Sequence, residues 1–272
     1  NNCISISPPL GDLGVKRQKL TFHIISRRKA IIYSKILQMK YSEIIRQAED
    51  SFLGSVEDFF KKAWGETDLP SHDLDHHRRV WNYVKEILGY YSEPEINQKI
   101  IINLLIASYF HDIGMSEDQG IRHGYRSRMA AESYLTLNRL RLSDHMDALT
   151  AIENHDNKEY GNPESSNIIL KILSVADDLD AFGSEGITRY LEIYRARGIS
   201  EESIGYKILE NAESRFENFK KFTEPGSELF NIHSIRYNEL REYFEGNNRT
   251  GMGWKSGGEQ SGSDQHSPSS NK

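Results

Sequence analysis

The sequence has almost no cysteine: Cys3 is the single thiol among 272 residues. One cysteine cannot form an internal disulfide or build a cysteine-based zinc site, and such scarcity fits a reducing compartment, so we expect a cytoplasmic protein. The chain also lacks a long apolar run. The best one, residues 100–110, is interrupted by Asn103 and Ser108, whereas a membrane-spanning helix needs about 18 uninterrupted apolar residues. The sequence therefore predicts no membrane span.

Acidic side chains outnumber basic ones outside the N-terminal part of the chain. The formal net charge is −6, from 34 basic and 40 acidic residues. Residues 1–38 carry seven basic side chains against Asp12 alone, a balance of +6, which leaves −12 for the rest of the chain. Because phosphate attraction supplies most nonspecific affinity for nucleic acid, no nucleic-acid partner is expected for this acidic body.

The two ends of the chain differ in composition from its middle. In residues 1–38, basic side chains break every short apolar run, which excludes a secretory signal with its unbroken apolar centre. This leader is expected to be disordered, to act as a transit peptide or membrane-surface arm, or to lie outside the native protein if Met39 is the initiating residue. Residues 246–272, dominated by Gly and Ser, are expected to form a disordered tail. Residues 39–245 show no linker and are expected to form one domain.

The apolar pattern of residues 39–245 has the period of an α-helix almost throughout. No segment alternates cleanly between polar and apolar residues, and the seven prolines lie mainly between helical segments, so the sequence predicts an all-α fold. The segment 95–111 is apolar nearly all round and is expected to be buried in the middle of the fold. The expected helices cover 41–64, a segment beginning near 75, then 95–111, 124–140, 143–155 with Ser143 as N-cap, 164–182, 185–197, 200–222 with Ser200 as N-cap, and 227–245.

Several histidines and aspartates fall on the apolar faces of these helices. His76, His111, His155 and Asp177 each stand at helical spacing from apolar residues of the same segment. An isolated histidine in such a place is ordinarily a core or helix-end residue. A buried aspartate costs several kcal/mol unless it is paired or bound to a metal. Imidazoles and carboxylates together suit Mn²⁺, Fe²⁺, Ni²⁺, Zn²⁺ or, less well, Mg²⁺.

Three motifs resemble the H…HD…D signature of the HD-domain superfamily of metal-dependent phosphohydrolases. The segment HDLDHHRRV at 72–80 is similar to the HDxxHxxRV opening of that family, the HD doublet stands at 111–112, and ADDLDA at 176–181 is similar to its third motif. The resemblance covers roughly residues 70–190 and implies a single-domain helical bundle. It also implies that His76, His111, Asp112 and Asp177 hold a divalent metal ion.

Many members of the superfamily hold a second ion with two further histidines between the HD doublet and the last aspartate. The resemblance implies His123 and His155 in that role, and hence a centre of one or two divalent ions (Mn, Fe, Ni, Mg or Zn). His145 is expected on the surface, because it shares a turn with charged residues. His72 and His77 are expected to lie behind the ligands or in a loop.

The resemblance further implies hydrolysis of a small-molecule phosphate ester, such as a nucleotide, by a metal-activated water. Asp112 and Asp180 are the expected catalytic residues: Asp112 would position the nucleophile, and Asp180 would accept a hydrogen bond from substrate or from a ligand histidine. Arg122 and Arg126, with Arg128 beside them, are candidates for binding the substrate phosphate; the alternative is a solvated basic face.

Other functions stay open at this level. Hydrolysis of cyclic di-GMP is disfavoured, because Met115 stands where many cyclic-dinucleotide phosphodiesterases have lysine, and because residues 155–163 lack the paired histidines and the Gly-Tyr-Pro triplet of the HD-GYP motif. The same six ligands could hold iron in an HD-fold di-iron oxygenase. A catalytically silent ligand-binding module is the third possibility. The oligomeric state does not follow from the sequence.

Overall fold

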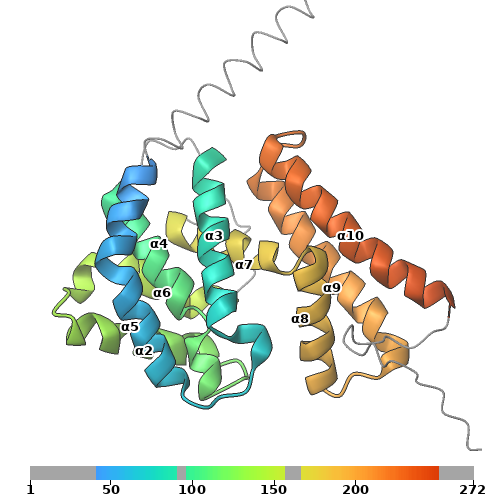
Figure 1. The fold of residues 1–272 in the computed structure, drawn as a ribbon, viewed down its shortest axis with the longest axis horizontal. Coiled ribbons are helices and arrows are strands. Elements are labelled where there is room, and N and C mark those ends of the chain that lie inside the picture. Colours follow the sequence, from blue (N-terminus) through green and yellow to red (C-terminus); the bar gives the residue numbers. More distant parts are fainter. Residues whose placement is uncertain (1–40, 91–95, 157–166, 251–272) are drawn as a thin grey trace, which may run out of the picture. The chain divides into compact units, whose positions relative to one another are not determined.

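The computed structural model describes residues 41–90, 96–156 and 167–250. These residues form helices and turns and contain no strand, which confirms the all-α prediction (Figure 1). The leader 1–38 and the tail beyond residue 250 lie outside the described residues, as does most of the segment 155–163 that was compared with the HD-GYP motif. The chain divides after Asp180 into two compact units, each of which is described by itself below, and the boundaries expected for one domain, 39–245, stay a prediction.

The helices of the first unit lie close to the segments expected from the apolar period. Residues 41–64 are helical, and a π-helical turn, Glu49–Leu53, leads into the last part of this segment. The named helices are α2 (Gly54–Trp64), α3 (Leu74–Tyr90), α4 (Gln98–Phe110), α5 (His123–Leu137), α6 (Met146–Asn154) and α7 (Ile168–Asp180).

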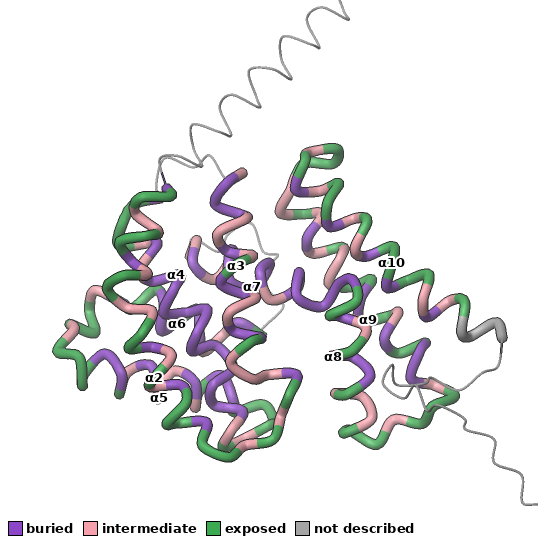
Figure 2. The backbone as a smooth tube through the Cα atoms, in the orientation of Figure 1, coloured by how far each residue is buried: buried purple, intermediate pink, exposed green. Residues whose placement is uncertain are grey.

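Helix α4 is the central helix of the first unit. It packs against α2, α3, α5, α6 and α7, and Ile101 and Leu104 have no exposed surface. The tube of α4 is coloured largely as buried in Figure 2. Asn97 caps its N-terminus by accepting a hydrogen bond from the backbone three residues later. At 13 residues α4 is too short to cross a membrane, and in the described part of the chain no other helix is long and apolar enough to do so. Because neighbouring helices surround α4, they also fix the positions of His111 and Asp112 at its C-terminal end.

Helix α6 begins later than the sequence predicted. Ser143, the expected N-cap, lies in the short 3-10 helix Leu142–Asp144, and His145 takes the N-cap position. The surface position expected for His145 is wrong as well, because the side chain is buried and its Nδ1 is hydrogen-bonded to the side-chain oxygen of Asn103 on α4. This polar partner on a neighbouring helix satisfies a buried imidazole.

The second unit is built from α8 (Gly183–Ala196), α9 (Glu201–Phe222) and α10 (Glu228–Thr250), with α10 packed against both other helices. An aromatic pair, Phe216 and Tyr237, stacks between α9 and α10 with a ring-centroid distance of 4.1 Å. Ser200 occupies the N-cap position of α9 as predicted, although its side chain makes no capping hydrogen bond. Helix α10 continues to Thr250, so residues 246–250 are helical instead of forming the start of the tail.

Candidate metal centre

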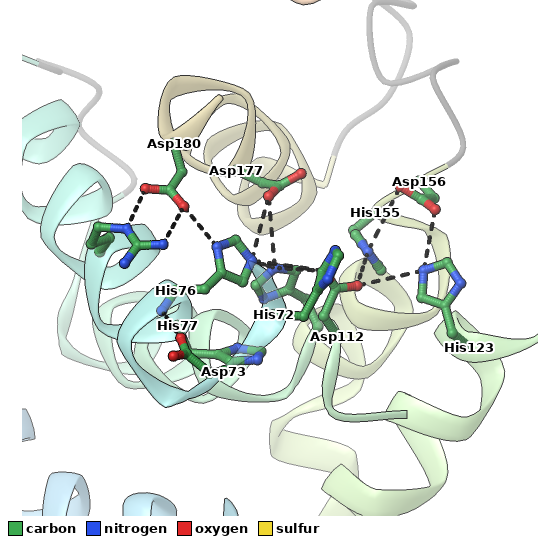
Figure 3. A network of polar contacts seen from close by, with 12 residues as sticks. His72, Asp73, His76, His77, Asp112, His123, His155, Asp156, Asp177 and Asp180 are labelled. Atoms are coloured by element: carbon green, nitrogen blue, oxygen red, sulfur yellow. Dashed lines mark hydrogen bonds and ion pairs between the residues drawn. The ribbon is translucent and has the colours of Figure 1, made fainter. Parts of the chain in front are cut away.

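The six side chains expected to bind metal come together in the first unit, beside the C-terminal end of α4. Figure 3 labels all of them except His111. Each comes from a helix end, where the backbone turns and lets side chains from several elements converge. His76 lies in the first turn of α3, His111 and Asp112 follow α4, His123 opens α5, His155 follows α6, and Asp177 lies in the last turn of α7. Five of the six are buried, and the side chain of Asp177 is 14% exposed.

One set of donor atoms lies between α3, α4 and α7. The Nε2 atoms of His76 and His111 are 3.1 Å apart, and Oδ2 of Asp112 lies 3.7 Å from the first and 3.6 Å from the second. Oδ1 of Asp177 lies 3.7 Å and 3.9 Å from the same two nitrogens. Two nitrogen ligands about 2.1 Å from an ion are separated by about 3.0 Å at an octahedral angle and about 3.4 Å at a tetrahedral one. Donor atoms of His76, His111 and Asp112 therefore fit a single divalent ion, and Asp177 faces the same two imidazoles.

A second set of donors lies on the other side of Asp112. Its Oδ1 is 2.9 Å from Nε2 of His155 and 3.5 Å from Nε2 of His123. The two imidazole rings stand nearly perpendicular, with centroids 5.2 Å apart. Asp112 thus directs one oxygen to each pair of histidines, which is the arrangement of a carboxylate that bridges two cations.

The other ring nitrogen, Nδ1, orients three of these histidines. A backbone carbonyl can only accept a hydrogen bond, so the proton of a neutral ring must sit on Nδ1 and the lone pair is left on Nε2, the atom directed at Asp112. The carbonyls are those of Ser108 for His111 at 3.0 Å, Gly120 for His123 at 2.7 Å and Ile152 for His155 at 2.8 Å.

His76 is oriented in the same way by a carboxylate. Its Nδ1 lies 2.8 Å from Oδ2 of Asp180, and Arg79 donates to the two oxygens of Asp180 at 2.8 and 3.2 Å. This contact to His76, an expected ligand, is one of the two contacts expected for Asp180, and the role of Asp180 stays a prediction. With both rings neutral, the lone pairs of His76 and His111 face each other across 3.1 Å and repel, unless a cation lies between them.

Burial and neighbouring charges set the ionisation of the centre. Burial lowers the pKa of His111 to about 4, so this ring is neutral at physiological pH. Burial alone would raise the pKa of Asp112, but His111 and His155 beside it hold that pKa well below its usual range. Burial alone would lower the pKa of His155, yet the carboxylate of Asp112 raises it to about 9. Since only the neutral ring is a ligand, a cation bound at His155 replaces a proton.

Three further side chains lie around the six. His77 is buried behind the first set, with Nδ1 3.0 Å from the carbonyl oxygen of Ser108, as expected for a residue behind the ligands. His72 lies at the rim, with Nε2 3.8 Å from Oδ2 of Asp112 and a side chain that is 13% exposed. Asp156, whose Oδ2 lies 3.1 Å from Nε2 of His123, is not part of any motif, and no periodic pattern singles it out.

The arginines expected to bind phosphate lie on or next to α5. Arg122 is 69% exposed and pairs with Asp118 at 2.8 Å, and Arg126 is 42% exposed with Nε 3.7 Å from a carboxylate oxygen of Glu117. Arg128 is held by two carboxylates, at 2.9 and 2.6 Å. The expectation that Arg122 and Arg126 bind substrate stays a prediction.

Comparison with known protein families matches the HD-CE family model to residues 56–242 of the chain. The matched span contains all six expected ligands and runs from the first compact unit into the second. Neither the curated proteins nor the solved structures gave a match.

Proposed function

Because the chain belongs to the HD-CE family and carries a buried cluster of imidazole and carboxylate donors, we propose that it is a metal-dependent phosphohydrolase that cleaves a small-molecule phosphate ester, such as a nucleotide. The observation that carries the proposal is the position of Asp112. Its Oδ2 lies 3.7 and 3.6 Å from Nε2 of His76 and His111, and its Oδ1 lies 3.5 and 2.9 Å from Nε2 of His123 and His155. One carboxylate that serves two imidazole pairs suits two cations about 3.5–4 Å apart, the spacing of metal pairs in many phosphate-cleaving enzymes.

Bound divalent ions would supply a water whose pKa is lowered towards neutrality and would offset the negative charge of the phosphoryl oxygens. The chain itself contributes a set of ligands that is oriented before any ion binds. The imidazoles are fixed through Nδ1, and the low pKa of Asp112 keeps its two oxygens ionised. We place Asp180 as a positioning residue that acts through His76, because its contacts are to that ring and to Arg79.

Arg122 and Arg126 are proposed to hold the phosphate group of the substrate. Both side chains are substantially exposed, and both stand close in sequence to His123, at the start of α5. An exposed ion pair such as that of Arg122 with Asp118 is worth only about 0–1 kcal/mol, so a doubly charged phosphate can displace the carboxylate.

The proposal is tested on full-length protein purified without oxygen. Its metal content is measured, and phosphate release is then followed with Mn²⁺ over a panel of nucleotides and phosphomonoesters. We expect release by the wild type and by Asp147→Asn, an exposed position on α6, and loss of at least about a hundredfold in His111→Ala and Asp112→Ala.

Three results would count against the proposal. Undiminished activity in His111→Ala or Asp112→Ala would exclude this site. A tightly held iron pair with oxygen uptake and no phosphate release would point to a di-iron oxygenase. Metal binding without turnover of any substrate in the panel would favour a silent ligand-binding module.

A further inference from the structure

The six expected ligands give the two halves of the centre unequal donor sets. The first half has two imidazoles and two carboxylates, since Asp112 and Asp177 both face His76 and His111. The second half has the imidazoles of His123 and His155 but only the shared carboxylate of Asp112. We propose that Asp156 is the missing carboxylate ligand of the second ion. The inference rests on the proposed metal centre and adds a ligand that the motifs do not supply.

Asp156 faces two imidazoles as Asp177 does, although it directs a different oxygen to each of them. Its Oδ2 lies 3.1 Å from Nε2 of His123, and its Oδ1 lies 3.9 Å from Nε2 of His155. Oδ1 of Asp177 stands at 3.7 and 3.9 Å from the two nitrogens of the first half. Figure 3 shows the two aspartates on either side of Asp112. Each half of the centre then consists of two imidazoles, one carboxylate that belongs to that half alone (Asp177 or Asp156), and one oxygen of Asp112.

The chemistry of the contact between Asp156 and His123 calls for a positive charge. The carbonyl of Gly120 accepts a hydrogen bond from Nδ1 of His123 at 2.7 Å, so the neutral ring presents a lone pair on Nε2. A lone pair and a carboxylate oxygen 3.1 Å apart are two acceptors, and a cation between them removes the repulsion. A proton on His123 could also do so, in which case the two residues form an ion pair and nothing more. The two arrangements differ in what happens to the second ion when Asp156 is changed.

Asp156 and Asp177 differ in how far their side chains are exposed to solvent. The side chain of Asp156 is 59% exposed, whereas that of Asp177 is 14% exposed and that of Asp112 is 8% exposed. An exposed ligand is less restrained by packing and competes with water for the ion. We therefore expect the first ion to bind tightly and the second to bind more weakly and to exchange with solvent.

The experiment is a titration of metal-free, full-length protein with Mn²⁺. Binding is measured by calorimetry and, independently, by the electron paramagnetic resonance signal of free Mn²⁺. The wild type should bind two ions with distinct affinities. Asp156→Asn should lower the affinity for the second ion by about tenfold or more and leave the affinity for the first ion within about twofold of the wild-type value. Asp147→Asn, a matched change at an exposed position on α6, should leave both affinities unchanged. Thermal unfolding of the metal-free variants verifies that each is folded.

Each remaining outcome overturns either the inference or its premise. If Asp156→Asn binds both ions as the wild type does, Asp156 is only an ion-pair partner of His123, and the proposed function is untouched. If the wild type binds a single ion, or if the variant weakens both ions equally, Asp156 is not a ligand of a separate second ion. If the wild type binds no ion at all, the metal centre itself is wrong, and the proposed function fails with it.

Discussion

Nδ1 of His76 lies 2.8 Å from Oδ2 of Asp180, a carboxylate with no exposed surface. Arg79 donates two hydrogen bonds to the same carboxylate, at 2.8 and 3.2 Å. A buried carboxylate between a guanidinium and an imidazole is satisfied on both sides, and it keeps the proton of His76 on Nδ1. His76 therefore presents its Nε2 lone pair in a fixed direction, towards His111 and the proposed first ion.

Changing Asp180 should lower the affinity for the first ion, although Asp180 is not itself one of the expected ligands. In Asp180→Asn the amide oxygen can still accept from His76, but the negative charge that balances Arg79 is lost. We expect the affinity for the first Mn²⁺ to fall by about ten- to a hundredfold, with a larger loss in Asp180→Ala, because partners behind a ligand histidine set its orientation and basicity. Calorimetric titration measures both affinities. An unchanged first affinity in both variants would show that Asp180 serves packing alone.

Removing metal should destabilise the protein in a way that depends on Asp112. At a free Mn²⁺ concentration one hundred times the dissociation constant, binding to the native state alone stabilises it by about 2.7 kcal/mol. For a chain of this size that corresponds to a rise in Tm of about 5–10 °C. EDTA should reverse the rise, and Asp112→Ala should abolish it, because Asp112 faces both imidazole pairs. A rise of equal size in Asp112→Ala would place the ion elsewhere.

The buried face of each helix could be predicted from sequence, because the period of apolar residues reports it directly. His76, His111 and His155 are buried where their spacing from apolar neighbours indicates. Their convergence on one carboxylate could not be predicted from the period, which says nothing about which helix ends meet. That expectation came from the order of three motifs, and the helix ends around α4 bring the residues together.

The sequence-based prediction was wrong for His145 and did not include Asp156, and both failures have the same physical origin. The burial of His145 depends on the side chain of Asn103, 42 residues earlier on another helix, and no pattern along one helix can reveal such a partner. Asp156 lies just beyond α6, outside any periodic segment, and it reaches His123 only because α5 packs against α6.

Gly114 should be intolerant of a side chain, because the turn after the HD doublet passes close to α5. A Cβ at Gly114 would lie 2.4 Å from the carbonyl oxygen of His123 and 2.5 Å from the amide nitrogen of Ser127. These are backbone atoms, so Gly114→Ala must displace the start of α5 and with it His123, an expected ligand. We expect a loss of about 1–3 kcal/mol in the free energy of unfolding, measured with urea, and weaker binding of the second ion.

A second glycine provides the control for this prediction. Gly54, the first residue of α2, has a helical φ of −60°, and a Cβ there would meet no atom within 4 Å. Gly54→Ala should leave metal binding unchanged and should stabilise the protein by up to about 1 kcal/mol, since alanine loses less backbone entropy in a helix. Equal effects of the two alanines on stability would contradict the steric argument for Gly114.

An ion pair between α2 and α3 supplies a test of pH dependence in which the titrating group, Glu57, is not an expected metal ligand. Arg78 donates to the two oxygens of Glu57 at 2.8 and 2.6 Å, and the hydroxyl of Tyr109 on α4 donates to the same carboxylate at 3.3 Å. The hydrogen bonds from Arg78 hold the pKa of Glu57 below its ordinary value, against the opposing effect of burial. The folded state thus binds fewer protons at this group than the unfolded state near the pKa of Glu57.

The stability that Glu57 contributes should therefore be present above its unfolded pKa, about 4.3, and should be lost as the pH falls through its lower folded pKa. At pH 7 we expect Glu57→Gln to reduce the free energy of unfolding by about 0.5–1 kcal/mol, a modest value because the side chain of Arg78 is 43% exposed. Below pH 4 the difference between wild type and variant should shrink, because protonation makes the wild-type side chain neutral like the amide. Urea denaturation of both proteins from pH 7 to pH 3 measures this difference. A difference that stays constant over that range would mean that packing, and not the charge of Glu57, joins α2 to α3 at this point.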